Sequence, residues 1–325
     1  MAMLSISRKK TSSKFIDILL NILMFVFPPY AIVRIFLTKS SIGEKIGKTI
    51  FFIIFYVYTA GIIFIVFWTF YNSFKNDIEF YDNMMAFPKV WRFSNYKEAY
   101  DYIRYDNGVV NVSFIQMFIN SIWFAGGSAF LATLMHAITG YIFAKYTFPG
   151  QKIAFRVILF TIALPIVGSL PSLYKVIYAL HLYDSPLILI MYLGGFGSNF
   201  LIMYAFFRSV DKTYMEAAEI DGASRFTIFF RIMLPLAFGP FLALFLLTFI
   251  AQWNNYETPL LFLDKMPTLS SGLFQFYEQM TFSESSSPHT VFFAGILLAS
   301  VPVIIMVALF GDKMMKNVNM GGIKG

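Results

Sequence analysis

The sequence contains no cysteine and only three histidines. Without cysteine there can be no disulfide framework and no thiol nucleophile, and the redox compartment stays undetermined. His136, His181 and His289 are far apart and none has the spacing of metal ligands, so we expect no metal site. Charged residues are also scarce, at 13% of the chain. No short apolar run near the start is followed by a small-residue cleavage pattern, so no cleaved secretion signal is expected.

Apolar residues are abundant instead, at 58% of the 325 residues, with 19% aromatic. This is more than one soluble core could bury, which favours lipid as the surroundings. A membrane-spanning helix needs about 20 mainly apolar residues. Such stretches lie at 50–72, 114–143, 157–178, 187–207, 236–262 and 291–311. They are too long for outer-membrane strands, so the sequence predicts an all-α integral membrane protein with six core transmembrane helices. Pro165 and Pro171 predict a kink in the third.

The distribution of Lys and Arg orients these spans. With the amino terminus inside and six crossings, most of the basic residues fall in inner loops, and the outer side keeps only Lys75, Lys89, Arg92, Lys97, Arg104, Lys175 and Lys265. Positive-inside bias therefore predicts that both termini are cytoplasmic. The net charge of +7 is then explained by inner loops facing anionic membrane lipid, and no nucleic-acid binding is needed.

Residues 15–36 do not fit this scheme. They are long enough to cross, but they contain Asp17 and the pair Pro28-Pro29, and basic residues flank both ends. We interpret them as a re-entrant or interfacial helical element broken at the prolines. The alternative is an ordinary seventh span. The chain would thus divide into an N-terminal basic and apolar element, 1–48, and a transmembrane domain, 49–325.

The segment 208–235 between the fourth and fifth spans is the most specific part of the sequence. Thr213 and Glu216 have the spacing of a capping box, which would begin a short helix at the membrane surface. Ala217 and Ala218 favour helix, and Gly222 can adopt the left-handed conformation that ends one. A second amphipathic stretch runs to Pro235. The pattern predicts two short cytoplasmic helices with an elbow at Gly222, although taken singly these residues would also suit an ordinary solvated loop.

The order of these residues resembles a known signature. Glu216-Ala217-Ala218, Gly222, Ile232 and Leu234-Pro235 have the full spacing of the EAA motif of binding-protein-dependent ABC importer permeases. Further motifs resemble the carbohydrate type, specifically the second permease of maltose and glycerol-phosphate-like systems. These motifs are Phe93-x-Asn95-Tyr96, Asn120-Ser121, Gly140-Tyr141 with Phe148-Pro149-Gly150, Asp221-Gly222-Ala223-Ser224, Trp253-Asn254 with Pro259-Leu260, and Gly321-Gly322-Ile323-Lys324-Gly325. The resemblance covers residues from about 50 to the end.

Two departures from the family pattern stand out. The family usually has proline where this chain has Asp211, and its amino-terminal tail is usually shorter than residues 1–48. Asp211 can itself cap a helix, so the first departure puts little in doubt.

The resemblance implies the fold and the partners. The fold would be that of an ABC type I importer permease in the bacterial plasma membrane. This chain would form half of the translocation pore, with a second, different permease as the other half. A cytosolic ATPase dimer would hold ATP and Mg, so this chain would bind no cofactor and perform no catalysis. An extracellular solute-binding protein would deliver the solute, which would be a sugar or an oligosaccharide.

The resemblance also assigns the coupling residues. Glu216 would make the polar contact with the ATPase, Ala217 and Ala218 would allow close approach, and Gly222 would form the elbow. The full coupling set is Glu216, Ala217, Ala218, Asp221, Gly222, Leu234 and Pro235.

Polar residues inside the spans are the other candidates. Asn120, Gln252, Asn254 and Asn255 could line a pore or hydrogen-bond between helices, and we favour the second reading because such bonding is common. The same reading holds for His136 and Asn199. The outer segment 263–289 would, by resemblance, reach into the cleft of the binding protein, or else be an unstructured connector.

The solute itself cannot be read from the sequence. A permease for peptides or phosphate esters is the nearest alternative. A secondary transporter would need functional intramembrane ionisable residues or an inverted repeat, and neither is visible.

Overall fold

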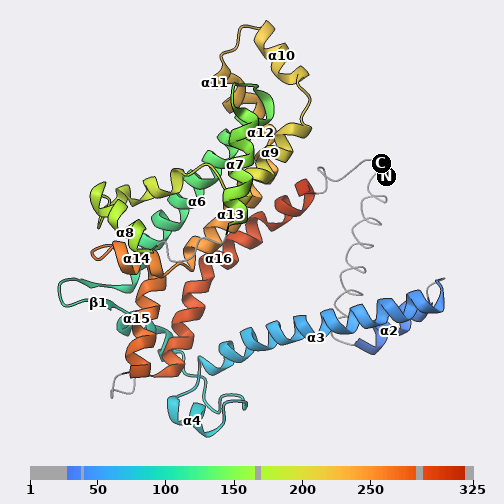
Figure 1. The fold of residues 1–325 in the computed structure, drawn as a ribbon. Coiled ribbons are helices and arrows are strands. Elements are labelled where there is room, and N and C mark those ends of the chain that lie inside the picture. Colours follow the sequence, from blue (N-terminus) through green and yellow to red (C-terminus); the bar gives the residue numbers. More distant parts are fainter. Residues whose placement is uncertain (1–27, 38–39, 165–169, 283–287, 319–325) are drawn as a thin grey trace, which may run out of the picture. The chain divides into compact units, whose positions relative to one another are not determined.

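The computed structural model describes residues 28–37, 40–164, 170–282 and 288–318. The chain divides into two compact units, residues 1–72 with 85–87 and residues 73–84 with 88–325. Each unit is described by itself. Helices make up most of both units (Figure 1).

The first unit contains α2 (Pro28–Leu37) and α3 (Ile42–Asn72). α3 has no charged residue after Lys48, and an 18-residue window within it has a mean hydropathy of 2.6, which is that of a membrane span. At its start the Lys45 amino group donates to the Phe36 carbonyl at 2.8 Å, which ties α3 to α2. α2 is described from Pro28 onward, and because the residues before it are not described, the break at the prolines stays a prediction. Residues 15–27 lie outside the described residues, so whether 15–36 crosses the membrane stays a prediction.

The second unit is built around α6 (Phe114–Lys145). α13 (Phe238–Trp253), α9 (Ser198–Ser209) and the 3-10 helix η1 (Pro186–Leu193) pack against it. Small side chains line the buried positions of α6, among them Ser121, Ala125, Ser128, Ala129, Ala132, Ala137 and Gly140. Small residues let helix backbones approach closely, which is how helices associate in lipid.

Further helices surround this centre (Figure 1). They are α7 (Gln151–Ala163), α8 (Leu170–Ala179), α14 (Glu257–Phe262), α15 (Leu269–Phe282) and α16 (His289–Val318). α16 packs against α13 and α15. α10 (Thr213–Ile220) and α11 (Arg225–Ile228) lie at one end of the unit, and we call this the hairpin end. The end that carries α4 and α15 is opposite to it.

The opposite end also holds structure that the sequence did not predict. The segment between α3 and α6 folds into α4 (Asp77–Asp82), α5 (Ser94–Tyr102) and an antiparallel hairpin of β1 (Tyr105–Asp106) and β2 (Asn111–Val112). The Lys75 amino group is buried there and donates to the Asn83 carbonyl at 2.9 Å. Burial lowers the pKa of Lys75, and the nearby Glu79 carboxylate partly opposes that shift. This segment is therefore folded, and its buried residues Ala99, Ile103, Tyr105 and Val112 share one hydrophobic cluster with residues of α6, α15 and α16.

The predicted spans are confirmed in part. Among the described residues, α3, α6 and residues His289–Gly311 of α16 are each long and apolar enough to cross a membrane. The predicted span 187–207 is a bent pair, η1 and α9, with an angle of 57° between them. The span 157–178 appears as α7 and α8, with the predicted kink at Pro165 outside the described residues. The count of six stays a prediction.

Glycine explains the break between η1 and α9. The Thr139 hydroxyl of α6 donates to the Gly195 carbonyl at 2.6 Å, and a Cβ on Gly195 would lie 2.5 Å from Thr139 Cγ2. The chain can approach α6 this closely only without a side chain at residue 195.

The segment 263–289, for which an unstructured connector was one of the two expectations, contains a helix. It contains α15, in which Leu269, Ser271 and Phe276 are buried. A Cβ on Gly272 would lie 2.3 Å from the Met117 sulfur of α6, so the helix is tightly packed. An unstructured connector is therefore the wrong interpretation of this segment.

Candidate functional site

The candidate site is the segment 208–235, which we call the coupling hairpin after the role that its resemblance implies. Asp211 precedes the first helix of this segment, and its Oδ1 atom accepts hydrogen bonds from the Thr213 backbone N–H, at 3.0 Å, and from the Thr213 hydroxyl, at 2.7 Å. These bonds hold the pKa of the Asp211 carboxyl below its ordinary value. The predicted capping box of Thr213 and Glu216 is wrong, because α10 begins at Thr213 itself and its hydroxyl is engaged by Asp211.

Gly222 ends α10 as predicted. Its φ of +76° lies in the left-handed region, and nothing lies within 4 Å of the position of a Cβ there. The Gly222 N–H donates to the Glu219 carbonyl at 3.0 Å, and the Ala223 N–H donates to the Ala218 carbonyl at 3.0 Å. This pair of bonds is a Schellman motif, which satisfies the last carbonyls of a helix. The chain therefore reverses at a defined elbow.

The second arm of the hairpin has three parts. Ser224 caps α11 by accepting from the Thr227 N–H at 3.2 Å. A π-helical turn, η2 (Phe229–Met233), follows, and α12 (Leu234–Leu236) leads into α13. Arg225–Leu236 and α13 meet at 78°. The two short helical arms that the sequence predicted are thus present, and the second one turns sharply into a span.

One face of the hairpin is packed into its own chain. Met215 and Ala218 of α10 join a buried cluster with Ile228, Phe229 and Met233 of the second arm. The same cluster includes Ala137 and Tyr141 of α6 and Met203 and Phe207 of α9. Burying these side chains anchors the hairpin to the two central helices.

The other face of α10 is exposed. Glu216 and Ala217 are both exposed to solvent, whereas Ala218 is only 7% exposed. The two alanines that the sequence grouped together therefore face different environments. Ala218 packs inside this chain, and Ala217 with Glu216 is available to a partner.

A hollow of about 540 Å³ lies beside these residues. It is lined by Asp211, Thr213, Tyr214, Ala217, Ala218, Asp221 and Ile232. Two carboxylates and small side chains thus border a depression between α10 and the second arm.

Sequence reasoning missed the groups that join the hairpin to α6. The Tyr141 ring packs against Phe207 and Phe229, with ring centroids 5.5 and 5.1 Å away. Its hydroxyl is 3.1 Å from the Tyr146 hydroxyl. The Arg225 guanidinium lies 5.4 Å from the centroid of the Tyr146 ring, a cation–π contact. In the sequence, Gly140-Tyr141 stands out only as part of a family motif. The hairpin that packs against Tyr141 lies far away along the chain, so local patterns do not reveal this contact.

The polar residues of the spans hydrogen-bond within the chain. Asn120 donates to the Pro267 carbonyl at 2.9 Å. The Gln252 side-chain oxygen accepts from the Tyr192 hydroxyl at 2.9 Å and from the Asn255 amide at 3.1 Å. Asn254 is exposed and donates only to its own helix, at the Ile250 carbonyl. Asn120 thus joins α6 to the loop before α15, and Gln252 joins α13 to η1. Asn254 borders a cavity of about 380 Å³ with Tyr256, Ser270 and Ser300.

His136 and Asn199 also contact neighbouring elements of the same chain. A Cβ on Gly197 would lie 3.5 Å from the His136 Nε2 atom, so the ring packs against the break between η1 and α9. The Asn199 amide donates to the Thr248 hydroxyl at 3.4 Å, between α9 and α13.

The comparison with protein families addresses the whole of this region. The family described as "Binding-protein-dependent transport system inner membrane component" matches residues 136–316, more than half of the chain. The chain belongs to this family. As a member, the permease is a non-catalytic membrane subunit of an ABC transporter. The family's description itself includes a binding protein as a partner of the transport system.

Individual relatives agree with that assignment. The permease is 26% identical to the diacetylchitobiose uptake system permease of Streptomyces coelicolor, over 78% of this chain and 82% of the relative. It is 29% identical to the arabinooligosaccharides transport system permease of Bacillus subtilis, over 75% and 83%. Sugar transporter permeases are thus among its homologues.

A solved structure shows the same fold. One chain from the crystal structure of a bacterial ABC transporter involved in the import of the acidic polysaccharide alginate matches with a TM-score of 0.69. The match covers 85% of the permease and 99% of that chain, at 21% identity. The permease therefore has the type I importer permease fold.

The Schellman elbow generates a first prediction. Gly222→Val should open the end of α10, because a β-branched residue at φ +76° costs about 1–2 kcal/mol or more. Gly222→Asn should behave nearly as wild type, since asparagine tolerates the left-handed region. Hydrogen exchange of residues 213–228 in the purified protein would measure this. Equal exchange in the valine variant and the wild type would contradict the elbow's role, because the space around Gly222 is open and only its backbone conformation is at stake.

Proposed function

We propose that this chain is one of two different permease subunits of an ATP-driven importer, and that it couples to a cytosolic ATPase through α10. The observation that supports this most directly is the division of α10 into two faces. Met215 and Ala218 are buried in the permease, while Glu216 and Ala217 are exposed at the hairpin end. A helix in that position can be held rigidly by one protein and presented to the groove of another.

The contacts of the hairpin suggest how the coupling works. ATP binding closes the ATPase pair, and each ATPase moves the helix that lies in its groove. Asp221 and Gly222 fix the end of α10, and the cluster around Tyr141 joins it to α6 and α9. A displacement of α10 therefore moves the central helices with it, because a packed core transmits strain. ATP and Mg would stay on the partner ATPase.

The solute class follows from the relatives. Their names refer to diacetylchitobiose, arabinooligosaccharides, starch degradation products and sulfoquinovosyl glycerol. We infer that this importer carries a sugar or oligosaccharide delivered by an extracellular solute-binding protein. α15 and the segment around it, at the end opposite to the hairpin, would meet that protein. A permease for a peptide or a phosphate ester is the alternative, and a secondary transporter would leave the two-faced hairpin without a role.

Glu216→Ala tests the coupling. The variant should insert in the membrane normally but should retain about tenfold less ATPase on purification, and uptake should fall in parallel. Loss of a hydrogen bond to a charged group costs roughly 1.5–3 kcal/mol, and 1.4 kcal/mol is a factor of ten in affinity.

The matched control is Glu278→Ala, which removes an exposed glutamate from α15 at the opposite end. It should retain ATPase at the wild-type level. Wild-type ATPase retention and undiminished uptake in Glu216→Ala would refute the assignment of the hairpin.

The hydrogen bonds of the spans suggest that the second permease supplies most of the solute contacts. Gln252 and Asn255 bond to each other, and Gln252 also bonds to Tyr192. A hydroxylated solute needs a partner for each hydroxyl that it desolvates, and these amides are already engaged.

Substituting Gln252, Asn254 and Asn255 with alanine one at a time should therefore lower assembly or coupling more than it changes sugar preference. Uptake of a labelled sugar against unlabelled competitors would measure preference, and co-purification would measure assembly. A clean change of preference with assembly intact would place the solute site in this subunit.

Membrane orientation is the last part of the proposal. Both termini would be cytoplasmic, with the hairpin end on the same side, and residues 15–36 would not cross. Because the chain has no cysteine, Ser5→Cys provides a single reactive thiol. It should resist a membrane-impermeant thiol reagent in intact cells and react after the cells are opened. Labelling in intact cells would establish a seventh span instead.

A further inference from the structure

Lys145 connects the end of α6 to the segment that leads into α10. Its ammonium group donates a hydrogen bond to the Val210 carbonyl. Lys145 is the last residue of α6, and Val210 is the residue directly after α9, so both helices end at this bond. The carbonyl groups at a helix C-terminus carry partial negative charge, and a cation between two such ends is stabilised by both. The bond therefore holds together α6, α9 and the start of the coupling hairpin.

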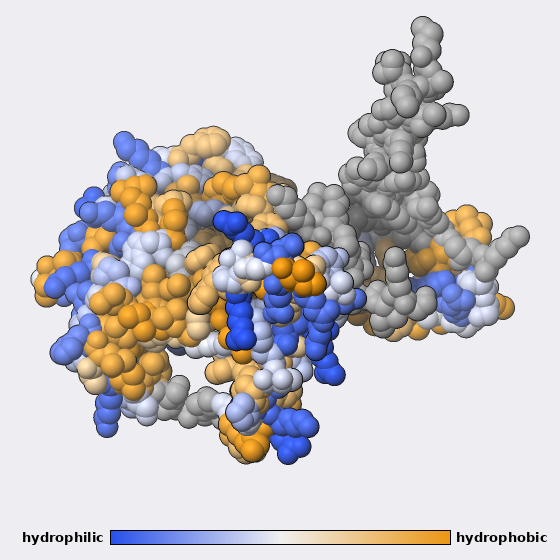
Figure 2. Space-filling view, turned by 90° about the horizontal axis from the view of Figure 1, so that it is seen from above, coloured by the Kyte–Doolittle hydropathy of each residue, from blue (hydrophilic) through white to orange (hydrophobic). Residues whose placement is uncertain are grey.

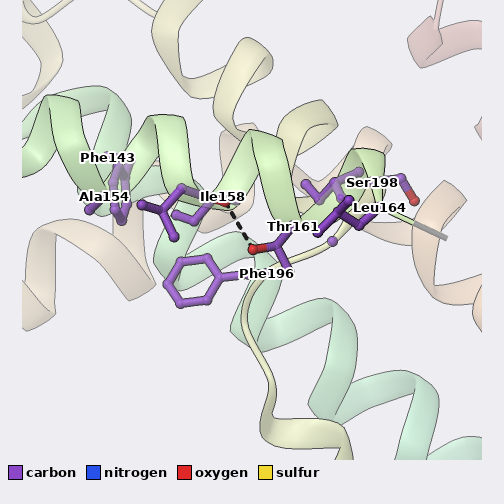
Figure 3. A pocket seen from close by; sticks show the side chains of 10 residues that line it. Phe143, Ala154, Ile158, Thr161, Leu164, Phe196 and Ser198 are labelled. Atoms are coloured by element: carbon purple, nitrogen blue, oxygen red, sulfur yellow. Dashed lines mark hydrogen bonds between the residues drawn. The ribbon is translucent and has the colours of Figure 1, made fainter. Parts of the chain in front are cut away.

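The end of α6 is fixed to α7 by groups other than Lys145. The Gln151 side-chain amide, from the first residue of α7, donates to the Phe143 and Tyr146 carbonyls at 2.8 and 2.9 Å. Phe143 also packs against α7, and Figure 3 shows it beside Ala154. Attachment of α6 to α7 thus does not account for the lysine, whose hydrogen bond is given to the hairpin instead.

The charges around Lys145 favour the same placement. Lys212 and Asp211 both act on it, with opposite signs. The bonds from Thr213 are the main cause of the lowered pKa of Asp211, and the charge of Lys145 contributes to it as well. Asp211 and Lys145 form no ion pair within 4 Å in the described part of the chain, so their attraction acts through space. This attraction favours a positive charge beside the Val210 carbonyl.

The end of α6 makes two further contacts with the hairpin. The Tyr141 hydroxyl donates to the Met215 sulfur, a weak acceptor, at 3.9 Å. The Arg225 guanidinium lies over the Tyr146 ring. Both contacts are weaker than a hydrogen bond from an ammonium group to a carbonyl. The end of α6 therefore touches the hairpin before, within and after α10, and the strongest of the three contacts is the one before it.

The other end of α10 is open. Nothing lies within 4 Å of the position of a Cβ on Gly222, and Ile220, the last residue of α10, is 86% exposed. Figure 2 views the molecule from above this end and shows hydrophilic side chains exposed among hydrophobic ones. α10 is therefore held at its start and accessible at its end.

We propose that Lys145 is a positioning residue for coupling, which transmits a displacement of α10 to α6. This inference rests on the proposed function, because it takes a partner ATPase to be what moves α10. Without the bond to Val210, the start of α10 can shift while α6 stays in place, since only the two weaker contacts remain. The ATPase still binds, because Glu216 and Ala217 are unchanged, but its movement no longer reaches the central helices.

The first test uses spin labels on the purified full chain alone. Because the chain has no cysteine, Ile119→Cys on α6 and Ile220→Cys on α10 place two labels at exposed positions. Double electron–electron resonance measures the distribution of distances between them. Lys145→Met, which removes the charge and the donor, should widen this distribution at least twofold. Lys145→Arg, which keeps both, should leave it as narrow as lysine does.

The second test compares ATPase retention with uptake in the complete importer, by the assays used for Glu216→Ala. Lys145→Met should retain the ATPase within twofold of wild type, whereas uptake should fall at least fivefold, and Lys145→Arg should restore uptake. The matched control is Lys152→Met, which removes an exposed lysine at the start of α7 and should leave both quantities at the wild-type level. A residue that only stabilised the fold would lower retention and uptake together.

An unchanged distance distribution or normal uptake in Lys145→Met would refute the proposal. A loss of ATPase as large as that expected for Glu216→Ala would also refute it, because Lys145 would then support ATPase binding. So would failure of Lys145→Arg to restore uptake, since the hydrogen bond would then not be what matters. The proposed function fails by a different result, full ATPase retention in Glu216→Ala, and the distance measurement needs no partner, so the two failures can be told apart.

Discussion

At Gly140 the backbones of α6 and α9 approach more closely than a side chain would allow. A Cβ there would lie 2.9 Å from both the Met203 Cβ and the Tyr204 backbone nitrogen. This contact brings Tyr141 beside Phe207 and the hairpin, and it places Tyr204 beside Phe155 of α7. In lipid, where apolar side chains gain little by meeting each other, such close packing of backbones is what determines helix position. The position of the coupling hairpin depends on this contact.

The coupling hairpin shows how far local sequence can lead. Gly222 was predictable because glycine adopts the left-handed conformation without steric cost, and the elbow is where the pattern placed it. The start of α10 was not, because Asp211 and Thr213 both offer oxygens and only the backbone decides which one is used. The different exposure of Ala217 and Ala218 was equally hidden, since it depends on where α6 and α9 lie.

Spans were predictable where hydropathy alone decides them, as in α3 with its uncharged run after Lys48. They were less predictable where the helix is broken. The bend between η1 and α9 depends on Thr139, more than 50 residues away, contacting Gly195. The folded segment between α3 and α6 escaped notice because its elements are short and polar, and its order comes from buried groups such as Asn95, which donates to the Ser73 and Lys75 carbonyls. Short-range patterns carry little information about such contacts.

The π-helical turn η2 has a consequence for the direction in which the hairpin points. Leu234 donates to the Phe229 carbonyl, five residues back, and the next residue, Pro235, has no N–H to give to Arg231 in an α-helical bond. If this turn were α-helical, the hairpin residues before it would be rotated relative to α13 by about 100°, the angle of one residue. In an α-helical turn the ring of Pro235 would also clash with the Arg231 carbonyl, so that alternative is disfavoured. A single residue thus helps to fix the rotation of α10 relative to α13. An alanine at position 235 would restore the missing donor and allow two phases of the hairpin to compete.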